Sequence, residues 1–371
     1  MRPKYVFYLA VVPAYRRYCI EVLSESCGDE VAFYAGESHL DETVRTGISE
    51  RYVSRVRNRP LLRNRVLLQT GHLREALSAE VCVIDLNPRS LTAWMLALLR
   101  RLLMRRTLAW GHLYPRAGAE SRSAPVRVLL RRLTAGTILY GYDSVVPARQ
   151  DLPRKPLWVA PNSLYPKGTL RAQDGKRKRI LYVGRLESMK NVQILVQAFI
   201  QSKLWSDGMS LDIVGFGSLE GNIRKDVESS GIRDHINVHG RIDDVESLAD
   251  LYSESLFSVS PGYVGLSLTQ SLGFGVPMLY AKNEPHAPEI ELVRFAGTRD
   301  FSPSTVDALS EAMVSFAEDL RRSPTNRDSL AQQIQQHYSA ESMADGLLRA
   351  LRGEPMDLGL DGWPSSRWSG K

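Results

Sequence analysis

Short runs of apolar residues alternate with amphipathic stretches along most of this chain. Residues 180–183 form one such run, and Gly184 closes it, which is typical of a strand buried in a parallel sheet. Apolar residues then recur at the spacing of one helix face, at Val192, Leu195, Val196 and Phe199. Strands that alternate with helices predict βαβ units and a parallel, doubly wound sheet.

The alternation occurs in both halves of the chain. In the first half, strands are expected over residues 4–12, 30–35, 81–85, 107–110 and 137–142. Helices are expected after Pro13 and over residues 91–104, whereas the polar, arginine-rich residues 39–75 predict loops and one helix. In the second half, the expected strands cover residues 180–183, 210–214, 236–239, 256–259 and 277–281. The expected helices there cover residues 191–203, 219–230, 245–254, 265–273 and 305–320.

A stretch rich in proline, glycine and basic residues, 163–178, predicts a linker between two domains. The length of 371 residues also suits two domains of ordinary size. We therefore expect an α/β protein with two doubly wound, Rossmann-like domains, over residues 1–165 and 166–338, that face each other across a cleft. Ligands of such sheets bind beyond the carboxyl ends of the strands, which places the expected site in that cleft.

The charge of the chain is unevenly distributed. The net charge is +7, and arginine is concentrated in the first half. This asymmetry predicts an anionic partner for that half: a membrane surface, a phosphorylated acceptor or nucleic acid. Nucleic acid fits least, because the basic residues lie on apolar helices without interleaved aromatic residues. Three cysteines without metal-ligand spacing, and the lack of a signal-peptide pattern, favour a reducing cytoplasm.

An apolar and basic stretch of the first half suggests contact with an anionic membrane. Residues 125–134 place Arg127 and Arg131 one turn apart, with apolar residues opposite, and the preceding helix ends in Arg100, Arg101, Arg105 and Arg106. An apolar stripe beside a cationic face suits a bilayer surface. The alternative is an ordinary core helix with a solvated arginine edge. The apolar stretch 91–104 is itself too short to span a bilayer.

Chemistry-bearing residues stand where predicted strands end. Arg185 and Lys190 lie between the strand closed by Gly184 and the next helix. A strand end, a glycine, two cations and a helix start form a common site for phosphate or pyrophosphate. The alternative is that both cations are solvated turn residues.

Four further strand ends carry residues of interest. They are Trp110-Gly111-His112, Gly215-Phe216-Gly217, His239-Gly240-Arg241 and Ser260 to Gly265. The helix that starts at Gly265 presents free N–H groups to an anion and carries Gln270 one turn in. For the glycines a plain tight turn is the alternative, and for His112 a structural role.

The motifs of the second half, taken in the order in which they follow one another along the chain, resemble those of the family-four retaining glycosyltransferases, which have the GT-B fold. Val183-Gly184-Arg185-Leu186 with Lys190 resembles the family's arginine–lysine pair, and Val238-His239-Gly240-Arg241 resembles its segment at the nucleotide base. Gly262 to Pro277 resembles its nucleotide-sugar helix. The likeness implies a helix at about 339–353 that returns to the first domain, followed by a tail over 354–371.

The resemblance also implies roles for individual residues. It places Arg185 and Lys190 at the pyrophosphate, with His112 at the donor sugar. The remaining nucleotide-sugar contacts are expected at Gly184, Gly215, Gly217, Gly240, Arg241, Gly262, Gly265, Leu266 and Gln270. No Asp-x-Asp pair that could bind a metal stands at a strand end. Asp243-Asp244 is expected to cap a helix instead. Neither a metal nor another cofactor is therefore expected.

The chain departs from the family at its last motif. The family usually has two glutamates there, eight positions apart, where this chain has Gly262 and Gln270. Gln270 can still bond to ribose hydroxyls. Pro261-Gly262 predicts the centre of a type II turn with a positive φ at Gly262, which would aim backbone N–H groups at the donor. The alternative is that this glycine only shapes the turn.

The sequence therefore predicts a retaining glycosyltransferase of the hexosyltransferase type. It would move a sugar from a nucleotide sugar to a polysaccharide or a lipid-linked acceptor, in the cytoplasm or at the inner face of the cell membrane. Two alternatives remain open. One is another GT-B enzyme of sugar phosphates, such as an epimerase or a phosphorylase, and the other is a non-catalytic subunit that binds nucleotide sugars.

Overall fold

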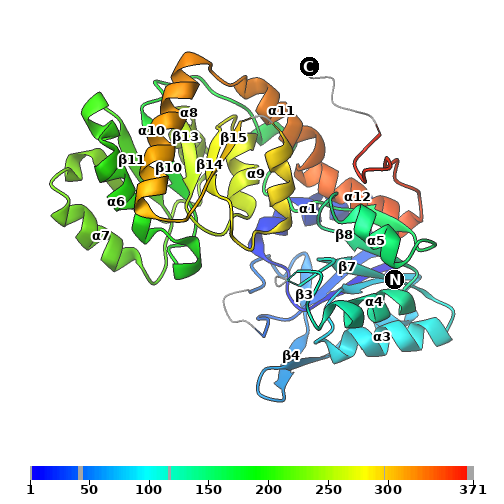
Figure 1. The fold of residues 1–371 in the computed structure, drawn as a ribbon. Helices are drawn as coiled ribbons and strands as arrows, with labels where there is room; N and C mark the ends of the chain where they lie inside the picture. Colours follow the sequence, from blue (N-terminus) through cyan, green and yellow to red (C-terminus); the bar gives the residue numbers. More distant parts are fainter. Residues whose placement is uncertain (1, 41–44, 116–117, 296, 366–371) are drawn as a thin grey trace. The chain divides into compact units, whose positions relative to one another are not determined.

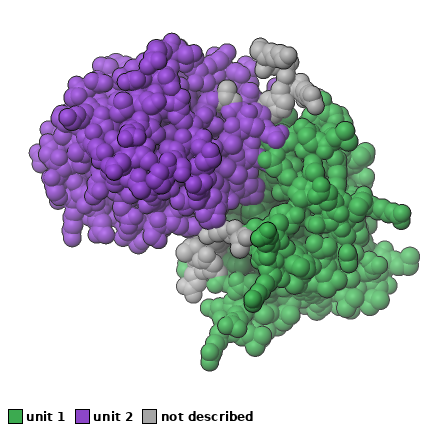
Figure 2. Space-filling view, viewed as in Figure 1, with its two compact units in different colours: residues 1–167, 337–369, 371 green, residues 168–336, 370 purple. Residues whose placement is uncertain are grey.

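The computed structural model describes residues 2–40, 45–115, 118–295 and 297–365, and the chain divides into two compact units (Figure 2). Unit 1 takes the chain up to Lys167 and the C-terminal stretch from His337. Unit 2 takes Gly168–Gln336. The expected boundary between residues 165 and 166 lies close to this division.

Unit 1 is built on seven parallel strands in the order β3-β2-β1-β6-β7-β8-β9 (Figure 1). Every side chain of β1 is buried, because helices cover both faces of the sheet. The chain leaves β1 toward β2 and later resumes on the other side of β1 with β6. The strands are β1 Tyr5–Leu9, β2 Val31–Ala35, β3 Val53–Arg55, β6 Val81–Asp85, β7 Arg106–Gly111, β8 Gly136–Leu139 and β9 Leu157–Val159.

The helices expected after Pro13 and over residues 91–104 are present in unit 1, whereas the helix over Val145–Asp151 was not expected. The Ser90 hydroxyl accepts the Ala93 N–H and so caps α3, which is the amphipathic helix predicted over 91–104. The α-helices are α1 Arg17–Cys27, α2 Leu73–Ser78, α3 Leu91–Leu102, α4 Ala124–Leu133, α5 Val145–Asp151 and α12 Ala340–Arg352. Short 3-10 turns are η1 Ala14–Arg16, η2 Gly28–Glu30 and, at the start of unit 2, η3 Lys167–Thr169.

The last helix, α12, packs in unit 1 against α1 and β9 (Figure 1). Ser339 caps its first turn, and Gly346 faces the sheet. A Cβ at Gly346 would lie 2.0 Å from the Val159 carbonyl oxygen, so only glycine allows this helix to approach β9 so closely.

The expectation of loops and one helix over residues 39–75 is wrong for much of this stretch. It contains β3 and an antiparallel hairpin, β4 Arg57–Leu61 with β5 Val66–Thr70, before the expected helix α2. The side chains of β4 are mostly exposed, so the strand has no alternating apolar face that would reveal it in the sequence. Residues 41–44 lie outside the described part of the chain.

Several arginines expected on a cationic surface of α3 and α4 instead point into unit 1. Arg100 is fully buried, and its guanidinium donates to the carbonyls of Ala76 (2.6 Å) and Ala79 (3.0 Å). Burial lowers the pKa of Arg100. Arg131 is also buried and pairs with Asp151 at 2.7 Å. Because these side chains serve as internal tethers, the expected cationic face of Arg127 and Arg131 is wrong.

Unit 2 contains six parallel strands in the order β12-β11-β10-β13-β14-β15. Its five expected strands and five expected helices are confirmed. The strands are β10 Arg179–Val183, β11 Ser210–Val214, β12 Ile236–Gly240, β13 Ser255–Ser260, β14 Met278–Ala281 and the unexpected β15 Thr298–Phe301. The α-helices are α6 Gln193–Ser202, α7 Glu220–Ser229, α8 Val245–Ser253, α9 Leu266–Gly273, α10 Val306–Arg322 and α11 Arg327–His337. The 3-10 turns are η4 Ser188–Lys190, η5 Leu204–Asp207, η6 Arg233–His235 and η7 Pro288–Arg294.

Within the described residues, no helix combines the length and the apolar character that a membrane span requires.

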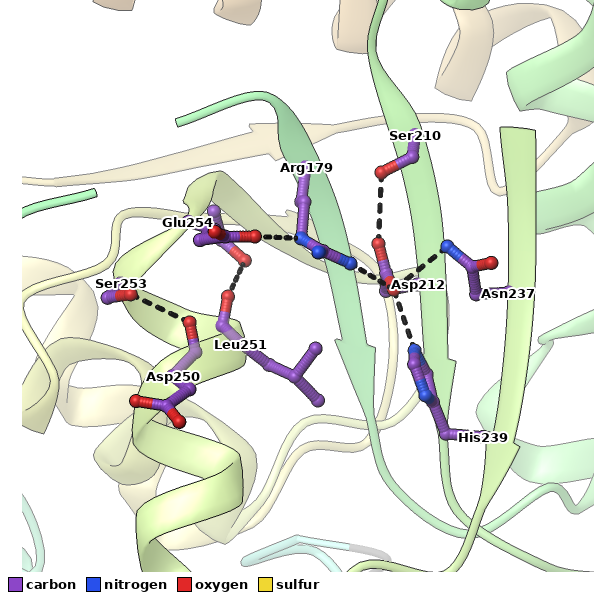
Figure 3. A network of polar contacts seen from close by, with 10 residues as sticks. Arg179, Ser210, Asp212, Asn237, His239, Asp250, Leu251, Ser253 and Glu254 are labelled. Atoms are coloured by element: carbon purple, nitrogen blue, oxygen red, sulfur yellow. Dashed lines mark hydrogen bonds and ion pairs between the residues drawn. The ribbon is translucent and has the colours of Figure 1, made fainter. Parts of the chain in front are cut away.

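A buried carboxylate joins three strands of unit 2 (Figure 3). Asp212 of β11 has no exposed surface, and its Oδ1 accepts from Arg179 of β10 (2.9 Å) and from Asn237 (3.1 Å) and His239 (2.6 Å) of β12. Its Oδ2 accepts from the Ser210 hydroxyl at 3.1 Å. Several donors around one buried charge compensate for its lost hydration. Asp212 therefore ties the edge strand β12 and the strand β10 to β11, which lies between them.

We expect Asp212→Ala to lower the free energy of unfolding by about 2–3 kcal/mol, because Arg179 and His239 lose a shared partner. The value is smaller than for a fully buried pair because Arg179 is partly exposed. Chemical denaturation followed by circular dichroism measures the change. Asp250→Ala is the matched control, since Asp250 is an exposed residue of α8 near the same network. An equal loss in both variants would contradict the role of Asp212.

Candidate functional site

Three loops of unit 2 follow β10, β11 and β13 and are joined through their backbones. The Gly184 N–H donates to the Val214 carbonyl at 3.0 Å, and the Leu186 N–H donates to the Phe216 carbonyl at 2.9 Å. The loop after β13 joins them through the Tyr263 N–H, which donates to the Met189 carbonyl at 3.1 Å. The loops therefore form one connected edge at the carboxyl ends of these strands.

Glycines make this close packing of loops possible. Gly215 has a φ of +147°, and a Cβ there would lie 1.8 Å from the Gly184 carbonyl oxygen. A Cβ at Gly217 would lie 2.4 Å from the Leu186 carbonyl oxygen. The glycine turns were predicted as sites where the backbone approaches a ligand, and in the structure what they approach is a neighbouring loop.

The expected type II turn at Pro261-Gly262 is wrong, because the φ of Gly262 is not positive. Glycine is required here for a different reason: a Cβ would lie 2.6 Å from the Lys190 carbonyl carbon. The N–H of the next residue, Tyr263, donates to the Met189 carbonyl and does not point toward a sugar donor. Gly262 therefore lets the loop after β13 lie directly on η4.

The two cations of the turn after β10 have different environments. Arg185 is exposed, and its guanidinium has no hydrogen bond or ion pair with the described residues. Lys190 is buried, and its Nζ donates to the Tyr263 carbonyl at 2.7 Å and lies 4.7 Å from the centre of the Tyr263 ring. Arg185 can therefore reach an anion in solution, whereas Lys190 ties η4 to the loop that precedes α9.

Helix α9 begins at this edge. Gly265 is its N-cap residue and supplies no side-chain acceptor, so the first N–H groups, from Leu266 onward, have no partner from a capping side chain. Gln270 lies one turn further and is buried, with 7% of its surface exposed. The helix N-terminus concentrates partial positive charge next to Lys190, the tether described above.

His286 supports the same loop, although the motifs in the sequence do not mark it as a site residue. Its Nδ1 accepts the Val264 N–H at 3.0 Å, and its Nε2 lies 2.9 Å from the Ala281 carbonyl, to which it donates. This arrangement requires a neutral imidazole. Burial is the main cause that lowers the pKa of His286 from its ordinary value of 6.5. A lone histidine in a polar loop gives no sequence signal of such a role.

An exposed aromatic ring stands beside the loop after β12. Phe216, in the Gly-Phe-Gly turn, has 49% of its surface exposed, and the Arg241 guanidinium lies 5.1 Å from the centre of its ring. Arg241 also pairs with Asp243 at 2.7 Å, while the Gly240 carbonyl accepts the Gly215 N–H at 2.7 Å. His239, by contrast, turns away from this edge toward Asp212. Phe216 is therefore the side chain of these two loops that offers an open stacking surface.

The remaining predicted residue, His112, belongs to unit 1. It follows β7, is exposed, and its ring meets Tyr140 edge to face, with ring centres 4.7 Å apart. Its carbonyl accepts from Arg127 at 2.9 Å. His112 lines a cavity of about 490 Å³ within unit 1.

Comparisons with known proteins identify unit 2. Residues 171–337 match the family model described as glycosyl transferases group 1. Unit 2 is a group 1 glycosyltransferase domain. Over 115 residues, the chain is also 30% identical to the GtfA subunit of the UDP-N-acetylglucosamine–peptide N-acetylglucosaminyltransferase of Streptococcus gordonii. That match covers 31% of this chain and 22% of the relative.

Solved structures extend the likeness to both units. HepE of Anabaena, in complex with UDP, is 13% identical and has a TM-score of 0.68, over 95% of this chain and 100% of HepE. The pneumococcal O-GlcNAc transferase GtfA is 10% identical and has a TM-score of 0.66, over 95% of this chain and 99% of that chain. Sucrose-phosphate synthase of Thermosynechococcus elongatus is 15% identical and has a TM-score of 0.63, over 94% and 98%. These likenesses confirm the expected GT-B fold.

The glycosyltransferase domain holds all but one of the predicted site residues. Those of unit 2 lie on the four loops after β10 to β13 or at the start of α9. Asp244 caps α8 as expected, because its Oδ2 accepts the Ser247 N–H at 2.8 Å. Across the described residues of the chain, no three His, Cys, Asp or Glu side chains are grouped as metal ligands.

We expect acid to weaken the fold of the glycosyltransferase domain through His286. Because its pKa is lowered in the folded protein, the unfolded chain binds a proton more readily as the pH falls through 6.5. The free energy of unfolding should therefore fall below that pH. His286→Asn should flatten the dependence of the thermal midpoint on pH between about pH 7 and pH 5, since Asn does not titrate. An unchanged slope would show that the proton is taken up elsewhere.

Proposed function

We propose that this chain is a retaining hexosyltransferase that moves a sugar from a nucleotide sugar to a polysaccharide or glycolipid precursor. The observation that carries the proposal is the exposed Arg185, without an ion pair among the described residues, on the same edge as the uncapped start of α9, where three loops are fixed to one another. The relatives named above support the nucleotide sugar, because the HepE and pneumococcal GtfA structures contain UDP.

Each part of the edge has a role in the proposal. The leaving nucleoside diphosphate gains negative charge, and Arg185 with the N–H groups at Leu266 stabilises it without a metal. Lys190 holds the loop before α9 in place and adds positive charge. Gln270 bonds to the ribose, and Phe216 stacks on the base.

Arg185→Ala should lower turnover by about 10²- to 10³-fold, the usual loss of one fixed donor to developing charge. The fold should be unaffected, since the guanidinium has no partner among the described residues. Release of nucleotide from a panel of UDP-sugars measures turnover. Arg224→Ala is the matched control, because Arg224 is an exposed arginine of α7 whose one ion pair among the described residues is with Glu220. Equal turnover in wild type and Arg185→Ala would refute the role of Arg185.

We further propose that unit 1 contacts an anionic membrane through exposed apolar residues of α3, α4 and the turn after α3. These helices pack side by side. Met104 is 95% exposed and Leu102 is 71% exposed, values that a water-facing surface rarely shows. This α3–α4 surface consists of Leu91, Leu98, Leu99, Leu102, Leu103, Met104, Val126 and Leu129.

Charge around the α3–α4 surface favours anionic lipid over a neutral protein partner. The stretch from residue 91 to 134 contains nine arginines and one acidic residue. Arg100 and Arg131 are buried, whereas Arg101, Arg105 and Arg132 remain exposed. Each basic residue near an anionic bilayer contributes about 1 kcal/mol. Such a surface would bring a lipid-linked acceptor to the enzyme at the inner face of the membrane.

We expect the chain to co-sediment with vesicles that contain phosphatidylglycerol and not with vesicles of phosphatidylcholine alone. Replacing both Leu102 and Met104 by Gln should abolish this binding, because burial of their side chains drives it. Leu360→Gln is the matched control, since Leu360 is 98% exposed but lies in the C-terminal stretch. Equal binding to both kinds of vesicle, or none to either, would refute membrane docking.

A further inference from the structure

The cavity of unit 1 lies at the point where the order of the strands reverses. It opens beyond the carboxyl ends of β1, β6, β7 and β8, which are neighbours in the sheet. Ala10, after β1, donates its N–H to Asp85 at the end of β6, and this bond forms the floor. Open α/β sheets bind their ligands at such a switch point. The cavity is lined by residues of unit 1 alone.

A buried cation lines this cavity. Arg16 is only 4% exposed, and its guanidinium lies 4.3 Å from the centre of the Trp110 ring and 5.0 Å from that of Tyr140. No carboxylate of the described residues lies within 4.0 Å of it, and its Nε lacks a hydrogen-bond partner among them. The aromatic faces offset part of the cost of burying this charge, and an anionic ligand would offset the remainder.

A second arginine adds positive charge to the wall. Arg127 is half-buried, and its Nη1 donates to the carbonyls of Leu86 (2.7 Å) and His112 (2.9 Å), which fixes its position. Asp85 is the one carboxylate among the described residues that line the cavity, and burial raises its pKa to about 6. The cavity therefore has a net positive charge, beside the apolar surface of Leu86 and Trp110.

We propose that the cavity of unit 1 binds an oxyanion, the carboxylate or phosphate ester of an acidic sugar in the acceptor, next to Arg16 and Arg127. The apolar wall accommodates the sugar ring. The assignment to the acceptor rests on the proposed glycosyl transfer. The binding of the oxyanion does not, since it requires no nucleotide sugar.

The test measures binding of three probes to the full chain without donor, by isothermal titration calorimetry. Glucuronate carries a carboxylate, glucose 1-phosphate carries a phosphate ester, and glucose carries neither. We expect at least one anionic probe to bind at least tenfold more tightly than glucose, and the tighter of the two identifies the oxyanion. Arg185→Ala should leave its dissociation constant unchanged, because that variant alters unit 2.

Two substitutions separate a binding role of Arg16 from a structural one. Arg16→Met should weaken binding of the anion at least tenfold in a chain that still folds. Its thermal midpoint should fall only modestly, because Asp85 loses a nearby positive charge but no direct ion pair. Asp85→Asn should tighten binding at neutral pH, since the amide oxygen still accepts the Ala10 N–H while the repulsive charge is gone. If Arg16→Met does not fold, Arg127→Gln takes its place, with the same loss of binding expected.

Three results would overturn the proposal: no preference for either anion over glucose, unchanged binding in the folded arginine variant, or weaker binding in Asp85→Asn. A chain that releases nucleotide from UDP-sugars but shows one of these results would retain the proposed transfer and lose the oxyanion site. A chain that binds the anion but transfers no sugar would retain the oxyanion site and lose the proposed transfer.

Discussion

The approach of three backbone loops at the carboxyl edge of unit 2 governs the geometry of the proposed donor site. Gly215 and Gly217 let the first two loops touch through carbonyl and N–H groups, and Gly262 lets the third lie on η4. Side chains at these positions would separate the loops by the width of a methyl group or more. Once the loops are fixed, the position of Arg185 relative to the start of α9 is fixed as well. The frame of the site is therefore defined by backbone atoms.

Arginine serves two opposite purposes in unit 1. Arg100 and Arg131 lie inside and donate to backbone carbonyls of neighbouring helices, those of Ala76 in α2 and Ala148 in α5. Their long stems carry the charge through the apolar layer, so α3 and α4 can turn leucines outward without losing their attachment. Arg16 is also inside but is surrounded by aromatic faces, with no carboxylate in contact among the described residues. The high arginine content of this half thus reflects three roles: the internal tethers, an exposed basic surface, and the cation of Arg16 among aromatic rings.

The sequence predicted the strands of unit 2 well, because runs such as Ile180–Val183 are apolar on both faces and are closed by glycine. It failed for the hairpin β4–β5, whose exposed polar side chains carry no periodic signal. At the site, the order of motifs located Arg185 and α9, but the burial of Lys190 and the φ of Gly262 depend on contacts between loops that are distant in the sequence. His286 and Arg16 were missed as functional residues for the same reason, since their partners come from other elements of the fold.

The return of α12 to unit 1 has a consequence for synthesis of the chain. Unit 2 is an uninterrupted segment and has all its strands and helices as soon as the ribosome has made it. Unit 1 lacks its closing helix until all of unit 2 has been made, so the surfaces of α1 and β9 that pack on α12 stay uncovered during that time. Leu347 and Leu351, both fully buried in the finished protein, complete that surface. Nascent chains that stall within unit 2 would therefore present an unfinished apolar face to chaperones.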